Sequence, residues 1–236
     1  MGYEMELNTG NSIFDGLNSK RGIMICGYEW GFSKQDQLED ETHTATPENK
    51  DARTIFSNKS PRFGDKAFYW KYDNRIIKWF ELWGHRLSRD GLGGDFEKTL
   101  MQTNWCDTQG HSMPKETHAK LLDKYQVDNF IYHIRELDPS LILFMGSALI
   151  QILQNEKVLG QFSEIMGGPT SAPRFIQKEF SGRRFKIGFQ SFSRCDIASL
   201  PHPSGTRGLS DDYIELYSEE IGGLIKKVKS SKGILN

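Results

Sequence analysis

The sequence lacks long apolar runs. The longest, residues 141–145, is far shorter than the roughly 18 consecutive apolar residues that a membrane-spanning helix requires. Glu4 and Glu6 interrupt the start of the chain, so we do not expect a signal peptide. The sequence therefore predicts a protein with no membrane partner and a cytoplasmic location.

Cysteines are scarce, and the familiar cofactor motifs are absent. The three cysteines are Cys26, Cys106 and Cys195. Three cysteines this far apart exclude a four-cysteine iron–sulfur cluster or zinc ribbon. An odd number of cysteines favours a reducing compartment. Neither a Walker phosphate-binding motif nor a dinucleotide-binding glycine fingerprint occurs. We therefore expect a protein that uses neither a metal ion nor an organic cofactor.

An excess of charge of one sign is also lacking. The 236 residues carry 30 basic and 31 acidic side chains, for a formal net charge of -1. This balance argues against non-specific coating of nucleic acid, but the charge is unevenly distributed. Residues 36–51 carry six acidic side chains against one basic, whereas residues 174–207 carry seven basic against two acidic. A local basic segment of this kind binds phosphates; the alternative is a solvated hairpin without a ligand.

The pattern of apolar residues predicts an α/β fold. Apolar segments next to glycine are typical of strands buried on both faces, and apolar residues about 3.6 apart are typical of helices. The predicted strands are residues 22–28, 98–105, 141–145 and 185–192. The predicted helices are residues 75–87, 117–137 and 210–229, the last with Ser210 as N-cap. This alternation predicts a three-layer α/β/α arrangement around a mostly parallel sheet of roughly four strands.

We expect a single domain over residues 1–236, because no linker rich in proline or serine divides the chain. A chain of this length buries enough apolar surface to fold without a disulfide or a metal. Residues 32–65 are polar and are interpreted as a long excursion over the surface. Loops of that length are often functional. We expect the protein to be a monomer.

Polar residues follow three of the predicted strands. Tyr28 and Glu29 follow the first, Asn104 lies at the end of the second, and His202 comes after the last strand and before the final helix. In open α/β sheets, ligands bind beyond the carboxyl ends of the strands. The sequence therefore predicts that a carboxylate, an amide and an imidazole converge at one edge of the sheet.

These segments, in this order, resemble the motifs of the uracil-DNA glycosylase superfamily. The segments are Gly-Tyr-Glu-Trp-Gly at residues 27–31, Thr-Asn at 103–104, Leu-Phe-Met-Gly-Ser-Ala at 143–148 and His-Pro-Ser at 202–204. The His-Pro-Ser segment is the most specific of them. The resemblance implies a DNA glycosylase of base excision repair, which hydrolyses the N-glycosidic bond of uracil or another deaminated or damaged base. The implied partner is single- or double-stranded DNA with a flipped base.

The resemblance also implies a role for each matching residue. Glu29 takes the place of the Asp or Asn that positions water or stabilises charge, and His202 matches the histidine that hydrogen-bonds the departing base. Asn104 matches the asparagine that reads the base edge. Some branches use Glu in the second place of the first motif, where this chain has Tyr28. A base-stacking aromatic is expected between the first motif and the next helix, and two residues qualify, Phe63 and Phe68.

The implied DNA contacts come from the loop after His202 and from the basic segment. They are Ser204, Gly205, Thr206, Arg207, Arg183 and Arg184. Donors of such a loop hold the phosphates that flank the flipped nucleotide. Two departures from the family pattern bear on catalysis: Trp30 replaces the usual proline, and Thr206 stands where an intercalating leucine is known, leaving Arg207 or Leu209 as wedges. The alternative function is therefore a non-catalytic or redirected member that binds nucleic acid or a nucleobase through the same cleft.

Overall fold

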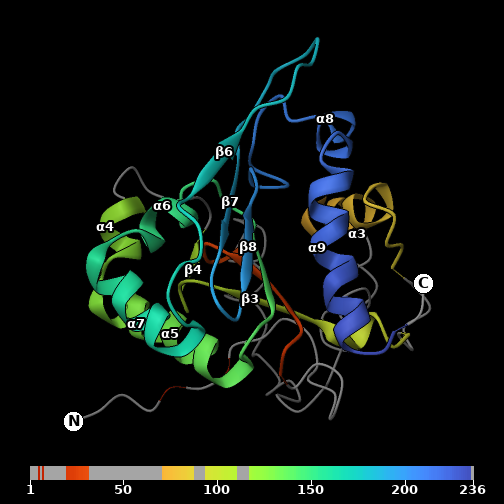
Figure 1. Cartoon of the computed structure of the whole chain (residues 1–236). Coiled ribbons are helices and arrows are strands. Elements are labelled where there is room, and N and C mark those ends of the chain that lie inside the picture. The colour runs from red at the N-terminus through yellow and green to blue at the C-terminus, as the bar shows by residue number, and fades with distance from the viewer. Residues whose placement is uncertain are drawn as a thin grey trace, which may run out of the picture.

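A mixed six-stranded sheet forms the centre of the protein (Figure 1). The computed structural model describes residues 20–31, 71–87, 94–110 and 117–234, together with Met5 and Leu7. The strand order is β3-β1-β5-β8-β7-β6. These strands are β1 (Ile23–Gly27), β3 (Leu100–Asn104), β5 (Leu141–Phe144), β6 (Arg174–Ile176), β7 (Ile187–Ser191) and β8 (Asp196–Ser199). A second, two-stranded sheet pairs β2 (Trp30–Gly31) with β4 (Gln109–Gly110).

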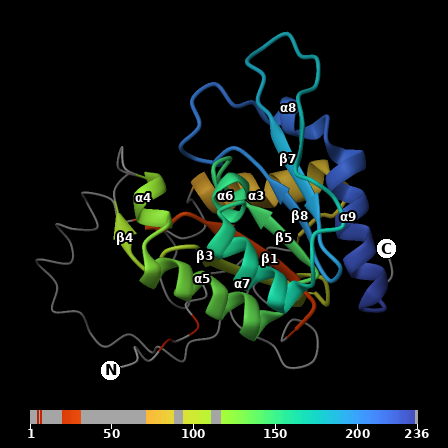
Figure 2. The same ribbon diagram turned by 60° about the vertical axis from the view of Figure 1, so that its left-hand side comes forward.

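Helices cover both faces of the large sheet, so the protein has three layers. They are α3 (Lys71–Leu82), α4 (Thr117–Leu121), α5 (Lys124–Leu137), α6 (Leu149–Leu153), α7 (Glu156–Met166), α8 (Asp211–Glu215), α9 (Ser218–Ser231) and the 3-10 helix η2 (Glu97–Thr99). Figures 1 and 2 show α4 to α7 on one face and α3, α8 and α9 on the other. Within the described ranges, no helix has the length and apolar character needed to cross a membrane.

The central strand β1 alternates between the two layers. Ile23 and Ile25 belong to the apolar cluster that includes Trp79 of α3 and Ile221 of α9. Met24 and Cys26 belong to the cluster on the opposite face, with side chains of α5, α6 and α7. Because successive side chains of a strand point to opposite faces, an uninterrupted apolar run is the pattern that a strand covered on both faces requires.

Four of the strands, β3, β1, β5 and β8, are parallel and end at the same level. Gly27 of β1 lies opposite Asn104 of β3, and Phe144 of β5 lies opposite Ser199 of β8. Hydrogen bonding continues past the strand ends, since the Leu200 N–H donates to the Phe144 carbonyl at 2.8 Å. The segments that follow these four strands therefore meet at one edge of the sheet.

The α/β/α fold is confirmed, but the sheet has six strands and not about four. The strand predicted at residues 185–192 is β7, which runs antiparallel to its neighbours and forms a hairpin with β6. The last parallel strand is β8, which the sequence analysis did not predict. It has only four residues, and its ends are polar: Asp196 accepts hydrogen bonds from Lys227 at 2.7 Å and from Ser191 at 2.6 Å. A strand this short and this polar shows no detectable apolar period.

Two of the three predicted helices are each divided in two. Residues 117–137 contain α4 and α5, because the Asp123 side chain accepts the N–H groups of Tyr125 at 3.0 Å and Gln126 at 3.4 Å and so caps a new helix. Residues 210–229 contain α8 and most of α9. The predicted Ser210 cap is confirmed, since the Tyr213 N–H donates to the Ser210 hydroxyl at 3.2 Å.

The third predicted helix begins earlier than expected. In the described residues, which here begin at Lys71, the helix runs over Lys71–Leu82, so it includes the turn before residue 75 and ends before residue 87. Gly84 follows its end with φ of 82°, a left-handed conformation that glycine adopts without strain and that terminates helices. The additional first turn brings Tyr72 of α3 to the edge where the parallel strands end.

The hairpin of β6 and β7 projects beyond the rest of the protein (Figure 1). Its base is fixed on α8 and α9 by two tyrosines. The Lys178 N–H donates to the hydroxyls of Tyr213 at 3.2 Å and Tyr217 at 3.1 Å, and the Tyr213 hydroxyl donates to the Phe185 carbonyl at 2.5 Å. Both arms of the hairpin are thus hydrogen-bonded to tyrosines of the α8–α9 region, which follows the His202 segment in the chain.

Candidate functional site

Tyr28, directly after β1, faces the parallel edge of the sheet. A Cβ atom at residue 146 would overlap the Tyr28 ring, so Gly146 is what allows the ring to lie there. The Ala148 N–H donates to the Tyr28 hydroxyl at 3.2 Å. The ring lies 6.3 Å from the His202 ring and is inclined to it by only 15°. Burial raises the pKa of Tyr28, so its hydroxyl is protonated at neutral pH.

Glu29, the next residue, has different surroundings. Its carboxylate accepts a hydrogen bond from the Thr108 hydroxyl at 2.9 Å and forms an ion pair with Lys120 of α4. The Glu29 side chain is only 6% exposed. Among the described residues, no hydrogen bond joins it to His202 or Asn104. The structure therefore pairs the Glu29 carboxylate with Thr108 and with Lys120 of α4.

Trp30, which stands where the superfamily has proline, takes part in the small sheet. Its N–H donates to the Thr108 carbonyl at 3.1 Å, a bond that a proline cannot make. The Cys106 N–H donates to the Tyr28 carbonyl at 2.8 Å. These bonds continue the pairing of the first motif with the segment after β3, and they hold the turn between Gly27 and β2.

Asn104 ends β3 directly beside Gly27. A Cβ atom at residue 27 would overlap the Asn104 Oδ1 and would come within 3.4 Å of the Tyr72 hydroxyl. Glycine at this position therefore makes the space that the Asn104 side chain occupies. Asn104 is only 7% exposed, so its amide lies in a sheltered position at the strand end.

Tyr72 of α3 is a site residue that the sequence analysis missed. Its ring lies 5.3 Å from that of His202. Burial, together with the neighbouring Asp73 and Cys26, raises the pKa of Tyr72 well above its usual value, so its hydroxyl is neutral. The apolar period predicted a helix that starts at residue 75, and Tyr72 lies in the additional first turn. Extending that helix toward the amino terminus would have identified it.

His202 follows β8 and is held in one orientation by its own loop. The Gly205 N–H donates to the His202 Nδ1 at 3.0 Å, and the Ser204 hydroxyl lies 3.4 Å from the same atom. An Nδ1 that accepts a hydrogen bond carries no proton, so the neutral ring has its N–H at Nε2. Burial lowers the pKa of His202 below its ordinary value of 6.5. The imidazole is therefore a neutral donor at neutral pH.

We call Tyr28, Tyr72, Asn104 and His202 the edge cluster. It combines aromatic rings with a neutral imidazole donor and an amide that both donates and accepts. Such groups hold a planar polar ring by stacking and by hydrogen bonds to its edge, and fixed neutral donors stabilise negative charge that develops on it. Within the described ranges, no group of three or more His, Cys, Asp and Glu side chains could hold a metal ion.

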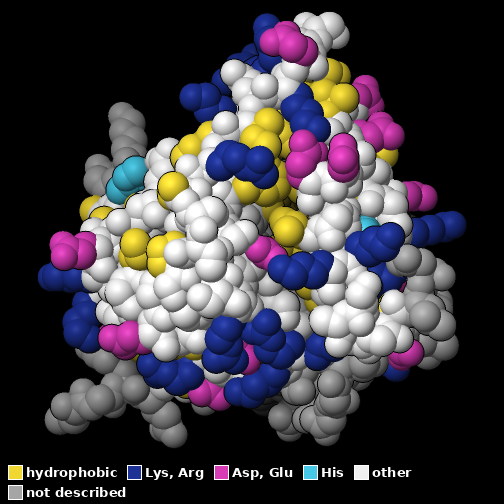
Figure 3. Space-filling view, viewed as in Figure 1, with side chains coloured by type: hydrophobic (Ala, Val, Ile, Leu, Met, Phe, Trp, Pro, Cys, Tyr) yellow, Lys and Arg dark blue, Asp and Glu magenta, His cyan; other side chains and the backbone are white. Residues whose placement is uncertain are grey.

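The two segments predicted to contact DNA lie together. Ser204, Gly205, Thr206 and Arg207 follow His202, and Arg183 of the projecting hairpin donates to the Arg207 carbonyl at 3.0 Å. Arg184 is exposed and pairs with Glu179 at 2.6 Å. Figure 3 shows Lys and Arg side chains around this hairpin, with acidic side chains among them. The predicted stacking residues, Phe63 and Phe68, and the predicted excursion at 32–65 lie outside the described residues.

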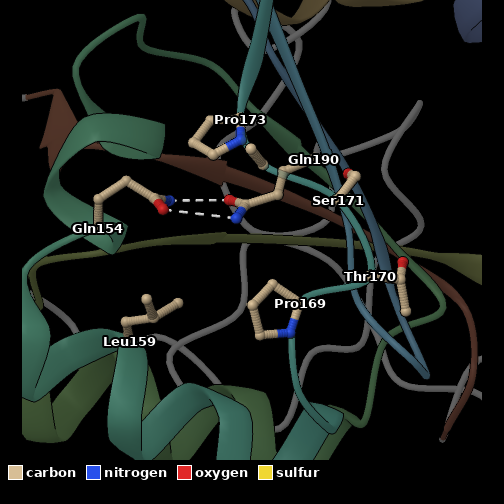
Figure 4. A pocket seen from close by; sticks show the side chains of 8 residues that line it. Gln154, Leu159, Pro169, Thr170, Ser171, Pro173 and Gln190 are labelled. Carbon is tan, nitrogen blue, oxygen red and sulfur yellow. Dashed lines mark hydrogen bonds between the residues drawn. The ribbon is translucent and has the colours of Figure 1, made fainter.

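A separate cavity of about 300 Å³ lies away from the edge cluster (Figure 4). Two of the side chains that line it, Gln154 and Gln190, face each other through their amides, and Gln154 Nε2 donates to Gln190 Oε1 at 2.8 Å. Gln190 is opposite Ile197, near the start of β8, so the cavity lies toward the amino end of the parallel strands. Its lining includes none of the predicted site residues.

No protein-family model matches this chain, and no curated protein matches it.

Proposed function

We propose that this protein is a DNA glycosylase that hydrolyses the N-glycosidic bond of uracil or another deaminated base. The observation that carries the proposal is the His202 imidazole, whose Nδ1 accepts the Gly205 N–H at 3.0 Å, so that the neutral ring keeps its N–H at Nε2. Asn104 ends β3 and His202 follows β8, so both lie at the carboxyl edge of the parallel strands, where α/β folds bind ligands. The ordered motifs provide separate support.

The chemistry of the reaction matches these groups. Breaking the bond develops positive charge on the sugar and leaves the electron pair, and so negative charge, on the base. The His202 Nε2–H donates to an oxygen of that base and stabilises the developing charge without transferring a proton. The Asn104 amide donates to and accepts from the pyrimidine edge. The base first leaves the stack at a cost of about a few kcal/mol. A water oxygen then bonds to the sugar carbon as the bond to the base breaks, and the proton that the water loses passes through solvent to the released base anion.

The proposal is tested with oligonucleotides that contain one uracil. Purified protein, in buffer with a chelator, is expected to release uracil and leave an abasic site that alkali converts to a strand break. A His202→Ala preparation purified in parallel controls for contaminating glycosylases. Wild-type protein that leaves uracil, hypoxanthine and xanthine intact in every DNA tested would overturn the enzymatic proposal.

One observation favours the alternative of a binding protein. The Glu29 carboxylate, which the resemblance assigns to catalysis, is engaged by Lys120 and Thr108. A site without a free carboxylate beneath the sugar still binds a base through the edge cluster. Tight binding of DNA or of free nucleobase without strand scission after alkali would support this second function.

The contacts of Glu29 lead to a prediction that separates its two roles. We expect Glu29→Gln to lower the free energy of unfolding by about 1–3 kcal/mol, because it removes the charged acceptor of Lys120 and Thr108. We expect the excision rate to change less than tenfold. Lys120→Met should show a similar loss of stability in chemical denaturation, as the matched partner variant.

The opposite pattern would return Glu29 to catalysis. If Glu29→Gln keeps the wild-type stability and slows excision by two orders of magnitude or more, Glu29 is the charge-stabilising residue that the resemblance implies. In that case Lys120→Met should leave excision unchanged.

The basic hairpin is expected to contribute to DNA binding through phosphates. Arg184→Ala with Lys186→Ala should weaken binding by a similar factor for every sequence tested. The slope of log affinity against log salt should fall by about one for each phosphate that the variant no longer neutralises. Lys157→Ala, an exposed change on α7, serves as the control. An unchanged slope would mean that these side chains form a solvated surface without a ligand.

A further inference from the structure

The loop that follows His202 is bound at both ends by one guanidinium, that of Arg75 on α3. Arg75 Nη1 donates to the Pro203 carbonyl at 2.7 Å, and Nη2 donates to the Leu209 carbonyl. Its Nε donates to Asp211 Oδ1 at 2.7 Å. One side chain therefore binds both ends of residues 203–209, which we call the His202 loop, and also binds the first residue of α8.

Arg75 is itself fixed. Its side chain is only 14% exposed, and its guanidinium lies 5.5 Å from the centre of the Trp79 ring. Asp211 is bound by Trp79 at 2.9 Å and Lys78 at 3.0 Å as well. Burial opposes ionisation of Asp211, but hydrogen bonds from Arg75, Trp79 and Lys78 prevail and lower its pKa. The anchor of the guanidinium is therefore an ionised carboxylate at neutral pH.

The carbonyl contacts determine where the N–H groups of the His202 loop point. In a trans peptide the C=O and the following N–H point in opposite directions, and no cis peptide occurs among the described residues. Because Arg75 binds the Pro203 carbonyl, the Ser204 N–H points away from α3. Because Arg183 binds the Arg207 carbonyl at 3.0 Å, the Gly208 N–H points away from the hairpin. Arginines thus bind the carbonyls of Pro203, Arg207 and Leu209, and the N–H groups of Ser204 and Gly208 point away from these arginines.

We propose that Arg75 is a positioning residue, which fixes the His202 loop so that His202 meets the flipped base and the Ser204 and Gly208 N–H groups meet its flanking phosphates. The part that concerns the base rests on the proposed glycosylase function. The part that concerns the loop applies to any anionic ligand of these N–H groups. Lysine cannot replace Arg75 here, because its ammonium cannot donate in one plane to two carbonyls and a carboxylate.

Lys78 offers a matched control on the same helix. It binds the same carboxylate, through Asp211 Oδ2, but within the described part of the chain no hydrogen bond joins its ammonium to the His202 loop. Lys78→Met therefore removes a cation from Asp211 and leaves both carbonyl contacts of the loop in place. An effect that is specific to loop position should appear in Arg75 variants and not in Lys78→Met.

The experiment compares Arg75→Lys and Arg75→Ala with Lys78→Met by three measurements. Hydrogen exchange of the Gly205 and Thr206 amides, which bind His202 Nδ1 and the His202 carbonyl, should become at least tenfold faster in the Arg75 variants only. The single-turnover excision rate should fall between about tenfold and 10²-fold, while KM changes less. Methylguanidinium, at concentrations that leave the protein folded, should restore part of the rate to Arg75→Ala.

Each outcome decides the proposal. Wild-type exchange and excision in folded Arg75→Lys would overturn it, as would equal effects in Lys78→Met, which would assign the effect to Asp211. If Arg75→Ala does not fold, Arg75→Lys carries the comparison. If the wild type excises no base, the glycosylase function fails, and the loop proposal is decided by amide exchange and by affinity for a single-stranded oligonucleotide.

Discussion

Replacing His202 with alanine should slow uracil excision by about two to three orders of magnitude in single-turnover measurements. The variant loses the neutral Nε2–H that would face the departing base, while the strand and the loop around it remain. His202→Gln is the informative comparison, because its amide restores a donor without the aromatic ring. Both variants must keep the wild-type melting profile. A folded His202→Ala that excises at the wild-type rate would remove His202 from the mechanism.

The same residue predicts the direction of a pH effect. Burial holds the pKa of folded His202 below 6.5, its ordinary value, which applies in the unfolded chain. Between these two values the unfolded chain binds more protons, so the free energy of unfolding falls as the pH drops through 6.5. Protonation also adds a proton at Nδ1, which then can no longer accept the Gly205 N–H. Excision should therefore decline only below the ordinary pKa of histidine, and His202→Gln should reduce the pH dependence of stability.

The second large effect on excision is expected from Gly27→Ala, which adds only one carbon atom. Gly27→Ala adds a Cβ atom that would overlap the Asn104 Oδ1, and the side-chain amide has to move away. Because Asn104 would read the base edge, we expect the excision rate to fall by about 10²-fold with little change in melting temperature. Discrimination between pyrimidines should also weaken, as it should in Asn104→Ala, because an amide that is out of place no longer penalises a poor match.

Gly31→Ala is the matched control for this change. Gly31 belongs to the same motif, and among the residues that the structure describes, a Cβ atom there has no neighbour within 4 Å. It should therefore leave both excision and melting unchanged. If Gly27→Ala is as active as Gly31→Ala, then Asn104 either tolerates the displacement or does not contact the base.

Local sequence patterns predicted the strands and helix caps that are determined by residues close together in the chain. The apolar runs of β1 and β5 and the Ser210 cap of α8 were confirmed because each depends on neighbouring backbone and side chains. The division of residues 117–137 into two helices has an equally local cause, the Asp123 cap. That signal was present in the sequence, but the continuous apolar period outweighed it.

Other features could not be predicted, because their causes lie far apart in the chain. Glu29 meets Lys120 only after α4 packs beside the first motif, 91 residues later. Tyr72 reaches His202 only because α3 lies against the edge where β8 ends. The strand β8 becomes evident only from its pairing with β5 and β7, because four residues with polar ends show no apolar period in the sequence.

The amino-acid sequence was enough to predict the α/β class and the order of the polar segments after the strands, because parallel strands bring their carboxyl ends to one edge whatever their detailed packing. It did not determine which side chains at that edge would be available for chemistry. That was decided by tertiary contacts: Lys120 engages Glu29, Gly205 sets the proton of His202 on Nε2, and Arg75 holds the His202 loop at two carbonyls. A motif specifies a residue type and a place in the chain. The charge, the tautomer and the orientation of that residue depend on partners that only the folded chain brings near.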